Sequence, residues 1–281
     1  MEFRLRSNSS TSKNPMLFDE FLREVAPSRG LQWRPFKRKG IERRVKDRIV
    51  QIGLSHFEEY LVKIKKDPEE QNHISKILTV TISRFFRDRE VFHAIGYSII
   101  PTLLEEKNKK DFKIWSIGCA SGEEPYSLSM LWKEKFEEIW PQINFSILAT
   151  DIDESLLERA KKGRYKKSSL KEVSEDILKG YFKMDNGFYI LGQAVRKCIE
   201  FKRHDIIHEE PFSEMDMVFC RNLAFTYFSK GSQMDVLKKI AGSLREKGYL
   251  VIGKDESLPL IYPTLFVPIF PKEKIYQKFT V

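Results

Sequence analysis

The chain of 281 residues carries 49 Lys and Arg against 40 Asp and Glu, a net charge of +9 at pH 7, and 41% of its residues are hydrophobic. This composition supports a packed core in one large domain or in a small and a medium one, and it excludes a wholly disordered chain. No run approaches the roughly 18 apolar residues of a membrane-spanning helix, and residues 1–12 lack the apolar segment of a secretory signal, so we expect a soluble cytoplasmic protein without membrane insertion.

The cysteines and histidines show no disulfide or metal-binding pattern. Cys119, Cys198 and Cys220 are far apart, odd in number and contain no Cys-x-x-Cys pair, so neither a disulfide framework nor a zinc site is expected. His204 and His208 lie four residues apart, but their spacing suggests no third ligand. We therefore predict a chain without a bound metal.

The N-terminal third predicts a small helical domain behind a flexible arm. Apolar residues recur at helical spacing over 18–25, and Ser55 with Glu58 three residues later has the pattern of an N-terminal capping box. No strand-like alternation occurs before about residue 110. The arm is assigned to residues 1–14 and the helical domain to residues 15–90.

Positive charge is concentrated within this domain. Residues 31–50 hold eight basic and two acidic residues, a local excess of +6, which favours an acidic partner. Apolar residues at helical spacing over 41–52 would pack one face of a helix inward. The side chains expected to contact a partner are Arg43, Arg44, Lys46 and Arg48. A merely solvated helix face is the alternative.

From Phe112 onward, short apolar strands alternate with helices, which is typical of a doubly wound α/β sheet. Asp153 is a candidate helix N-cap, and Gly163 is a candidate glycine at the end of that helix. The stretch 164–197 breaks the alternation and predicts a small β insertion. The tail to Val281 predicts a closing antiparallel hairpin. Strands are expected at 113–117, 145–150, 198–203, 216–220 and 249–252, and helices at 124–136, 153–160 and 234–244. Residues 91–281 form the second, Rossmann-like domain.

Ligands of such sheets bind beyond the carboxyl ends of the strands. The first strand ends in the turn Gly118 to Gly122, whose glycines permit close approach of a ligand to the backbone. Glu123 and Glu124 follow at once and would repel a phosphate at this helix N-terminus, and no Gly-Lys-Ser/Thr is present. A cationic ligand such as S-adenosylmethionine fits this turn better than a pyrophosphate. A purely structural turn remains the alternative.

Two acidic residues follow later strands. Asp151 ends the second strand, where an acid accepts hydrogen bonds from ribose hydroxyls in nucleotide-binding sheets. Asp205 follows the strand 198–203 and could contact an adenine edge, or it could be an ordinary loop residue. Together with the glycine turn, these residues favour a nucleoside-containing cofactor.

Five segments form a specific combination of motifs. They are Ser83 to Asp88 (Ser-Arg-Phe-Phe-Arg-Asp), Ile114 to Ser127 (Ile-Trp-Ser-Ile-Gly-Cys-Ala-Ser-Gly-Glu-Glu-Pro-Tyr-Ser), Ala149 to Asp153 (Ala-Thr-Asp-Ile-Asp), Ala160 to Tyr165 (Ala-Lys-Lys-Gly-Arg-Tyr) and Phe219 to Asn222 (Phe-Cys-Arg-Asn). In this order they resemble the CheR-type chemotaxis receptor glutamate methyltransferases, and the resemblance runs from roughly Met16 to Phe279. It implies a helical N-terminal domain, then a Rossmann-like class I methyltransferase domain with a small β-subdomain and an antiparallel C-terminal hairpin.

The resemblance also implies the site. Glu124 would bind the methionine ammonium, Asp151 the ribose, and Asp205 with Ile206 the adenine region. Arg87 would lie near the reaction centre, and Tyr227 beside the acceptor. The full set of implied cofactor-binding residues is Thr81, Ser83, Arg87, Gly118, Glu124, Asp151, Asp205, Ile206 and Asn222.

This chain departs from the family pattern at several positions. The family usually has Asn where Thr81 and Asp205 stand. Four residues, where the family commonly has three, separate Asn222 from Tyr227. Lys254-Asp255-Glu256 replaces a frequent Gly-His-Ser-Glu, and the β insertion is a few residues short.

The implied reaction is transfer of a methyl group from S-adenosylmethionine to a glutamate side chain, giving a γ-glutamyl methyl ester and S-adenosylhomocysteine. A glutamate carboxylate, with a pKa of about 4.3, is already ionised at neutral pH, so no general base is needed. The implied partner is the acidic coiled-coil cytoplasmic domain of methyl-accepting chemotaxis receptors rather than nucleic acid. Alternatives are a nucleic-acid methyltransferase, suggested by the basic charge, and a non-catalytic relative that binds S-adenosylmethionine without turnover.

Overall fold

The computed structural model describes residues 15–33, 39–78, 83–105 and 109–279, which divide into two compact units. One unit contains the described residues up to Arg29 and from Trp33 to Leu78, and the other contains Gly30–Gln32 and the chain beyond residue 78. Within the described ranges, no helix is both long enough and apolar enough to cross a membrane. Residues 83–90 thus lie in the second unit.

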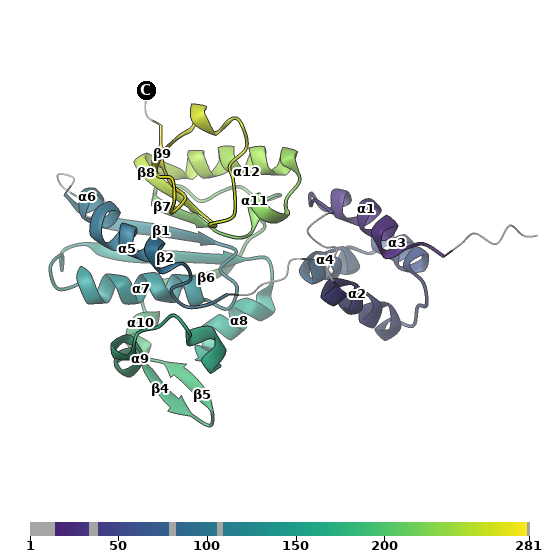
Figure 1. Cartoon of the computed structure of the whole chain (residues 1–281), viewed down its shortest axis with the longest axis horizontal. Coiled ribbons are helices and arrows are strands. Elements are labelled where there is room, and N and C mark those ends of the chain that lie inside the picture. Colours follow the sequence, from purple (N-terminus) through teal and green to yellow (C-terminus); the bar gives the residue numbers. More distant parts are fainter. Residues whose placement is uncertain (1–14, 34–38, 79–82, 106–108, 280–281) are drawn as a thin grey trace, which may run out of the picture. The chain divides into compact units, whose positions relative to one another are not determined.

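The first unit consists of the helices α1 (Phe18–Ser28), α2 (Lys39–Gln51), α3 (Phe57–Lys66) and α4 (Pro68–Leu78) (Figure 1). The apolar positions at helical spacing, such as Val25 and Val45, are fully buried. At the start of α3 the predicted capping residue is wrong by one position. Glu59, rather than Glu58, accepts the N–H groups of Ser55 and His56 at 2.9 and 3.2 Å. Glu58 instead accepts the Met16 N–H.

The second unit is built on a seven-stranded sheet of order β6-β2-β1-β7-β8-β10-β9. Its strands are β1 (Asp111–Ile117), β2 (Asn144–Asp151), β6 (Ile199–Arg203), β7 (Met215–Cys220), β8 (Leu244–Ile252), β9 (Phe266–Phe270) and β10 (Ile275–Lys278). The first five run parallel, β10 runs antiparallel to β8, and β9 runs antiparallel to β10. This arrangement confirms the predicted class I methyltransferase sheet and its closing hairpin.

Helices cover this sheet, and a second small sheet is inserted. The helices are α5 (Arg89–Ala94) and α6 (Ile100–Leu104), joined by the π-helical segment η2 (Ile95–Ile99), then α7 (Glu123–Lys135), α8 (Glu154–Lys162), α9 (Glu175–Tyr181), α10 (Gln193–Arg196), α11 (Ala224–Tyr227) and α12 (Lys230–Ser243). The predicted β insertion contains β3 (Arg164–Tyr165), β4 (Phe182–Asp185) and β5 (Phe188–Leu191) in the order β3-β5-β4, with a short 3-10 helix η3 (Lys167–Leu170).

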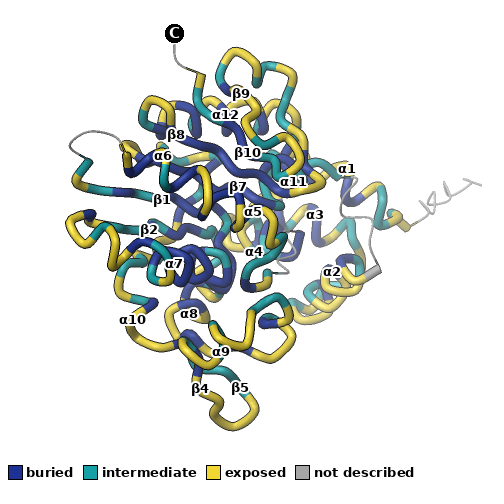
Figure 2. Tube along the Cα trace, turned by 60° about the vertical axis from the view of Figure 1, so that its left-hand side comes forward, coloured by how far each residue is buried: buried dark blue, intermediate teal, exposed yellow. Residues whose placement is uncertain are grey.

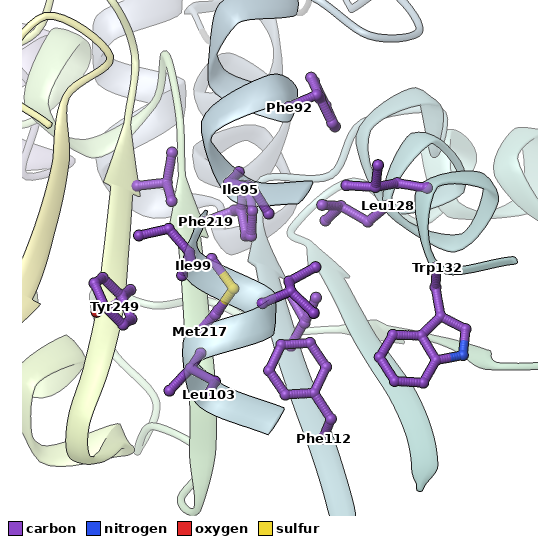
Figure 3. Packing of buried hydrophobic residues seen from close by; sticks show 14 of the residues in the cluster. Phe92, Ile95, Ile99, Leu103, Phe112, Leu128, Trp132, Met217, Phe219 and Tyr249 are labelled. Carbon is purple, nitrogen blue, oxygen red and sulfur yellow. The ribbon is translucent and has the colours of Figure 1, made fainter. Parts of the chain in front are cut away.

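One face of the large sheet packs against the α5–η2–α6 helix and α7. Alternate residues of the central strands, Met217 and Phe219 among them, contact Ile95, Ile99 and Leu103 of the helix (Figure 3). Every residue of β7 is buried, as Figure 2 shows for the middle of the sheet, whereas the last three residues of β4 and the turn to β5 are exposed. The buried strands thus form a rigid base, and the loops at their ends can carry function.

The amino ends of the strands are held by an ion network. Asp216, 2% exposed, accepts from the Lys109 ammonium at 2.6 Å and the Lys113 N–H at 2.8 Å. Arg245 binds both carboxylate oxygens of Asp111, at 2.7 and 3.1 Å. Because its charges are paired there, this edge is structural, and the opposite, carboxyl edge holds the candidate site.

Candidate functional site

The parallel register brings the predicted site segments to the carboxyl edge of the sheet. Ile117 at the end of β1 pairs with Thr150, and Asp151 at the end of β2 pairs with Arg203. Strand β1 lies between β2 and β7, so the order of connections reverses beside it. Such a reversal is where open α/β sheets bind their ligands.

The turn after β1 needs glycine at its first position. Gly118 has φ +71°, and a Cβ there would lie 2.6 Å from the Leu223 side chain. The N–H groups of Gly118 and Cys119 both donate to the Thr150 carbonyl, at 2.8 and 2.9 Å. The turn is therefore bonded to the end of β2, and a side chain at Gly118 would be strained by its positive φ and would require the Leu223 side chain to shift.

Asp151 holds this turn and retains acceptor capacity. Its two carboxylate oxygens each accept one backbone N–H, from Ala120 at 3.0 Å and from Asp153 at 2.9 Å. A carboxylate oxygen can accept two hydrogen bonds, so these two bonds leave acceptor capacity for a ribose hydroxyl. Burial raises the pKa of Asp151. The predicted helix ends are confirmed here, since the Asp153 side chain caps α8 and Gly163 ends it with φ +63°.

Three carboxylates surround the buried thiol of Cys119. Burial raises the pKa of this thiol, and the charges of Asp151, Glu124 and Glu123 raise it further. The glycine turn is therefore in an acidic environment, which fits a cationic ligand and opposes a phosphate. Burial also raises the pKa of Glu123, whose carboxylate accepts a hydrogen bond from Ser83.

Glu124 is shared with an arginine that the sequence reasoning did not assign. Its carboxylate accepts from the Ser116 hydroxyl at 2.8 Å and from the Arg221 guanidinium at 3.3 Å. Arg221, whose side chain is 4% exposed, also forms an ion pair with Asp88 and donates to the Arg87 carbonyl at 3.1 Å. Arg221 thus joins the end of β7, the first turn of α7 and the Phe-Phe-Arg-Asp segment. The sequence signal that could have identified Arg221 is its position directly before Asn222 in the Phe-Cys-Arg-Asn motif.

The Phe-Phe-Arg-Asp segment is a tight turn fastened to α7. Phe86 and Asp88 have φ of +52° and +61°; Asp tolerates such values, but a bulky residue such as Phe86 adopts them only when held by its surroundings. The Ser127 hydroxyl accepts the Phe86 N–H at 2.9 Å and donates to the Glu123 carbonyl at 2.7 Å. This contact explains why the motif ending in Ser127 accompanies the Phe-Phe-Arg-Asp motif. It leaves Arg87 half-buried at the turn.

The loop after β7 is organised by Glu256. Asn222 has φ +57°, and its N–H donates to the Glu256 carboxylate at 2.8 Å. Glu256 also accepts from the Gly253 N–H at 2.6 Å and the Thr226 hydroxyl at 2.7 Å. Of the four residues before Tyr227, Leu223 is the N-cap of helix α11 and the other three are its first residues; the half-buried Tyr227 is its last.

The loop after β6 carries Asp205 and Ile206. Burial acts to raise the pKa of Asp205, but hydrogen bonds from His208 and the backbone outweigh it, and the pKa is lowered. The carboxylate accepts from Ile207 N–H at 3.0 Å and contacts His208 Nδ1 at 2.7 Å. The Lys239 ammonium donates to the carbonyls of Ile206 and Ile207, and to that of Glu209. Asp205 therefore shapes its own loop, at the edge that carries Asp151.

The predicted residues fall into three groups. The second unit brings Ser83, Arg87, Gly118, Glu124, Asp151 and Asn222 together through the contacts above, with Asp205, Ile206 and Tyr227 on neighbouring loops of the same edge. Thr81 lies outside the described residues. The basic residues lie on α2 of the first unit.

On α2 the four predicted cations have different environments. Arg48 is 19% exposed and binds Glu70 through Nε at 3.2 Å, and Glu70 also accepts from Tyr60, so the guanidinium of Arg48 is engaged within the helical unit. The side chain of Arg43 is 84% exposed, and that of Lys46 is 57% exposed. Arg44 is also exposed.

Fold and site together define the class of protein. The strand order, the left-handed glycine turn, and the acids that follow β1 and β2 are those of a class I S-adenosylmethionine-dependent methyltransferase. The acceptor capacity of Asp151 and the acidic surroundings of the turn fit the ribose and the cationic methionine end of that cofactor.

Comparisons with known proteins identify the family. The model of the CheR methyltransferase S-adenosylmethionine-binding domain matches residues 81–271, and that of the CheR methyltransferase all-alpha domain matches residues 16–79. The chain is 33% identical to a chemotaxis protein methyltransferase of Listeria monocytogenes, over 85% of this chain and 88% of that protein. It is 30% identical to a putative methyltransferase of Pseudomonas putida, over 88% and 90% of the two chains, and 29% identical to a chemotaxis protein methyltransferase of Borreliella burgdorferi, over 78% and 80%. The chain belongs to the CheR family of S-adenosylmethionine-dependent chemotaxis protein methyltransferases.

Proposed function

We propose that this methyltransferase esterifies the γ-carboxyl groups of glutamates on the cytoplasmic, acidic coiled-coil domain of chemotaxis receptors, and that it acts in the cytoplasm. The observation that carries the proposal is the Arg221 bridge, which joins the cofactor acid Glu124 to the Arg87-Asp88 turn. The bridge holds the turn that carries Arg87, and the positive Arg87 side chain suits an acceptor that is an anion. Two of the relatives named above, those of Listeria monocytogenes and Borreliella burgdorferi, are chemotaxis protein methyltransferases, which supports the same substrate class.

The bound cofactor supplies a methyl group on a sulfonium, and the chain supplies position. We assign Glu124 to the methionine ammonium, Asp151 to the ribose, and Asp205 with Ile206 to the adenine region. Ser83, Asn222 and Thr81 are assigned to the methionine end. The acceptor glutamate is ionised at neutral pH, so the chain need not remove a proton. Alignment of the acceptor and exclusion of water remain as its tasks.

Arg87 and Tyr227 are assigned to the acceptor. Arg87 would hold the carboxylate through a positioning contact, since a fully paired, buried clamp would reduce its nucleophilicity. Tyr227 would orient the same group from the end of α11. On the first unit, Arg43, Arg44 and Lys46 would attract the acidic receptor, and reversing Arg43 and Arg44 to Glu should slow receptor methylation without changing cofactor affinity.

The experiment is a transfer assay with methyl-labelled S-adenosylmethionine on three acceptors: a receptor cytoplasmic fragment, duplex DNA and tRNA. We expect label on the receptor fragment only, released as methanol by alkali because a carboxyl ester is formed. Label on DNA or tRNA would identify a nucleic-acid methyltransferase. Cofactor binding without transfer to any acceptor would identify a non-catalytic relative.

A variant pair tests the assignment of Arg87. Arg87→Ala should lower the transfer rate by about 100-fold or more while S-adenosylhomocysteine affinity changes by less than about threefold. Arg84→Ala is the matched control, because Arg84 lies in the same segment, is 46% exposed and pairs with Glu172 at a distance of 3.9 Å. Equal rates in the two variants would contradict the assignment.

A further inference from the structure

A second basic segment lies in the methyltransferase domain itself. Residues 159–171 contain seven basic residues and no acidic one, a denser positive charge than that of residues 31–50. The segment runs from the end of α8 through β3 and η3, and all seven basic residues are exposed. In Figure 2 most of the trace beyond α8 and around α9 is exposed. This surface is not covered by any described part of the unit.

Most of these cations are not neutralised within the unit. Lys161 pairs with Glu158 at 2.9 Å, and the Arg164 guanidinium lies 3.9 Å from the centre of the Phe188 ring. The charge of Arg159 acts on the buried Glu123. We define the basic rim as the five remaining cations, which form no ion pair with another described residue: Lys162, Arg164, Lys166, Lys167 and Lys171. Like charges at this density repel one another, so the rim gains from an acidic partner.

The rim is fixed to both halves of the candidate site. The buried Tyr165 donates from its hydroxyl to the Ser121 carbonyl of the glycine turn, at 2.6 Å. On the other side, the Phe85 N–H donates to the Ser169 carbonyl at 3.0 Å. Phe85, Tyr165 and Leu170 share one buried cluster. The exposed cations therefore border the turn that presents Arg87, on a backbone that is tied to it by these hydrogen bonds and this shared core.

We infer that the basic rim binds the acidic side chains that flank the acceptor glutamate on the substrate helix. The inference rests on the proposed function, because an acceptor glutamate on a glutamate-rich coiled coil brings further carboxylates to whatever surrounds the site. Each exposed charge acts weakly alone, but several act together on encounter and on register. The rim lies in the same unit as the cofactor site, so it contributes whatever the placement of the helical unit. The basic rim thus takes part in recognising the substrate helix, in addition to the exposed cations of α2.

The test compares two double charge reversals of equal size. Lys166→Glu with Lys167→Glu alters the rim, and Lys238→Glu with Lys272→Glu is the control, because both control lysines are exposed in the same unit and outside the rim. Initial rates are measured against a chemoreceptor cytoplasmic fragment, and S-adenosylhomocysteine affinity is measured by calorimetry. For the rim variant we expect KM for the fragment to rise about tenfold, with kcat and cofactor affinity within about twofold of wild type.

Further measurements separate the explanations. Lys166→Gln with Lys167→Gln should raise KM less than the double reversal to Glu does. Higher salt should reduce the difference in KM between the wild type and the rim variant, since exposed charges are screened. Equal KM in the rim variant and the control would overturn the inference while leaving the proposed function standing. A wild type that methylates no receptor fragment would overturn the proposed function itself. Tight binding of a DNA duplex, lost in the rim variant only, would assign the rim to nucleic acid and overturn the inference.

Discussion

Glu256 offers a direct test of how the loops at the carboxyl edge are held. The residue is 3% exposed, and its carboxylate accepts from the Asn222 N–H, the Gly253 N–H and the Thr226 hydroxyl. Glu256→Ala leaves three donors without their acceptor, and each buried orphan costs roughly 1–3 kcal/mol. Water entering the vacated space would satisfy part of them, so we expect the free energy of unfolding to fall by about 3–5 kcal/mol. Asn222, at φ +57°, would lose the contact that holds its backbone, and cofactor affinity should fall as well.

Milder substitutions at Glu256 and Thr226 test whether the three hydrogen bonds account for the loss of stability. In Glu256→Gln the amide oxygen can take both N–H groups while the amide nitrogen donates to the Thr226 hydroxyl, so the loss should stay below about 1.5 kcal/mol. Thr226→Val removes one donor and should cost about 1 kcal/mol. Asp255→Ala is the control, because Asp255 is next to Glu256 in the chain and its side chain is exposed. Urea unfolding and calorimetry with S-adenosylhomocysteine measure both effects. A Glu256→Ala protein within about 0.5 kcal/mol of wild type would refute the account.

Two further predictions concern the cofactor turn. Gly118→Ala places a Cβ 2.6 Å from the Leu223 side chain at a φ of +71°. Calorimetry should therefore show at least about a tenfold loss of S-adenosylhomocysteine affinity, and adding Leu223→Ala should restore part of it. Unchanged affinity would show that the turn is not the cofactor site. Asp151→Ala should cost about 1.5–3 kcal/mol of the same binding free energy. Since burial raises the pKa of Asp151 and hydroxyl donors favour the ionised form, wild-type affinity should be full above that pKa and fall as pH drops through it, whereas Asp151→Asn should lose this dependence.

Much of the fold could be predicted because its signals are local. The glycine turn and the Gly163 helix end depend on positive φ angles that few other residues adopt, and the Asp153 cap depends on a side-chain oxygen that accepts the Ser155 N–H; each lies where it was expected. The capping residue of α3 was misplaced by one position, because Glu58 and Glu59 are equivalent in sequence and only the local geometry chooses between them.

The site was less predictable because its connections are long-range. The sequence marks Glu124 and the Arg87-Asp88 turn separately, but only the packed sheet brings Arg221 between them, from a strand almost 100 residues after Glu124. Glu256 looked like a departure from the family pattern, yet its carboxylate holds Asn222 through a contact that spans 34 residues. Periodicity and propensity carry no information on such pairs, whose geometry depends on the whole sheet.

The charge of the site leads to a last prediction, on how it distinguishes cofactor from product. The bridge of Asp88, Arg221 and Glu124 combines two acids with one base, and Asp151 adds a further carboxylate close by. S-adenosylmethionine carries a sulfonium charge that S-adenosylhomocysteine lacks, so the negative site should attract the former more strongly. Added salt screens this attraction, with a Debye length of about 8 Å at physiological ionic strength. Affinity for S-adenosylmethionine should therefore fall more steeply with salt than affinity for S-adenosylhomocysteine, as measured by calorimetry. Parallel salt dependences would mean that the acidic residues bind hydrogen-bond donors without sensing the sulfonium.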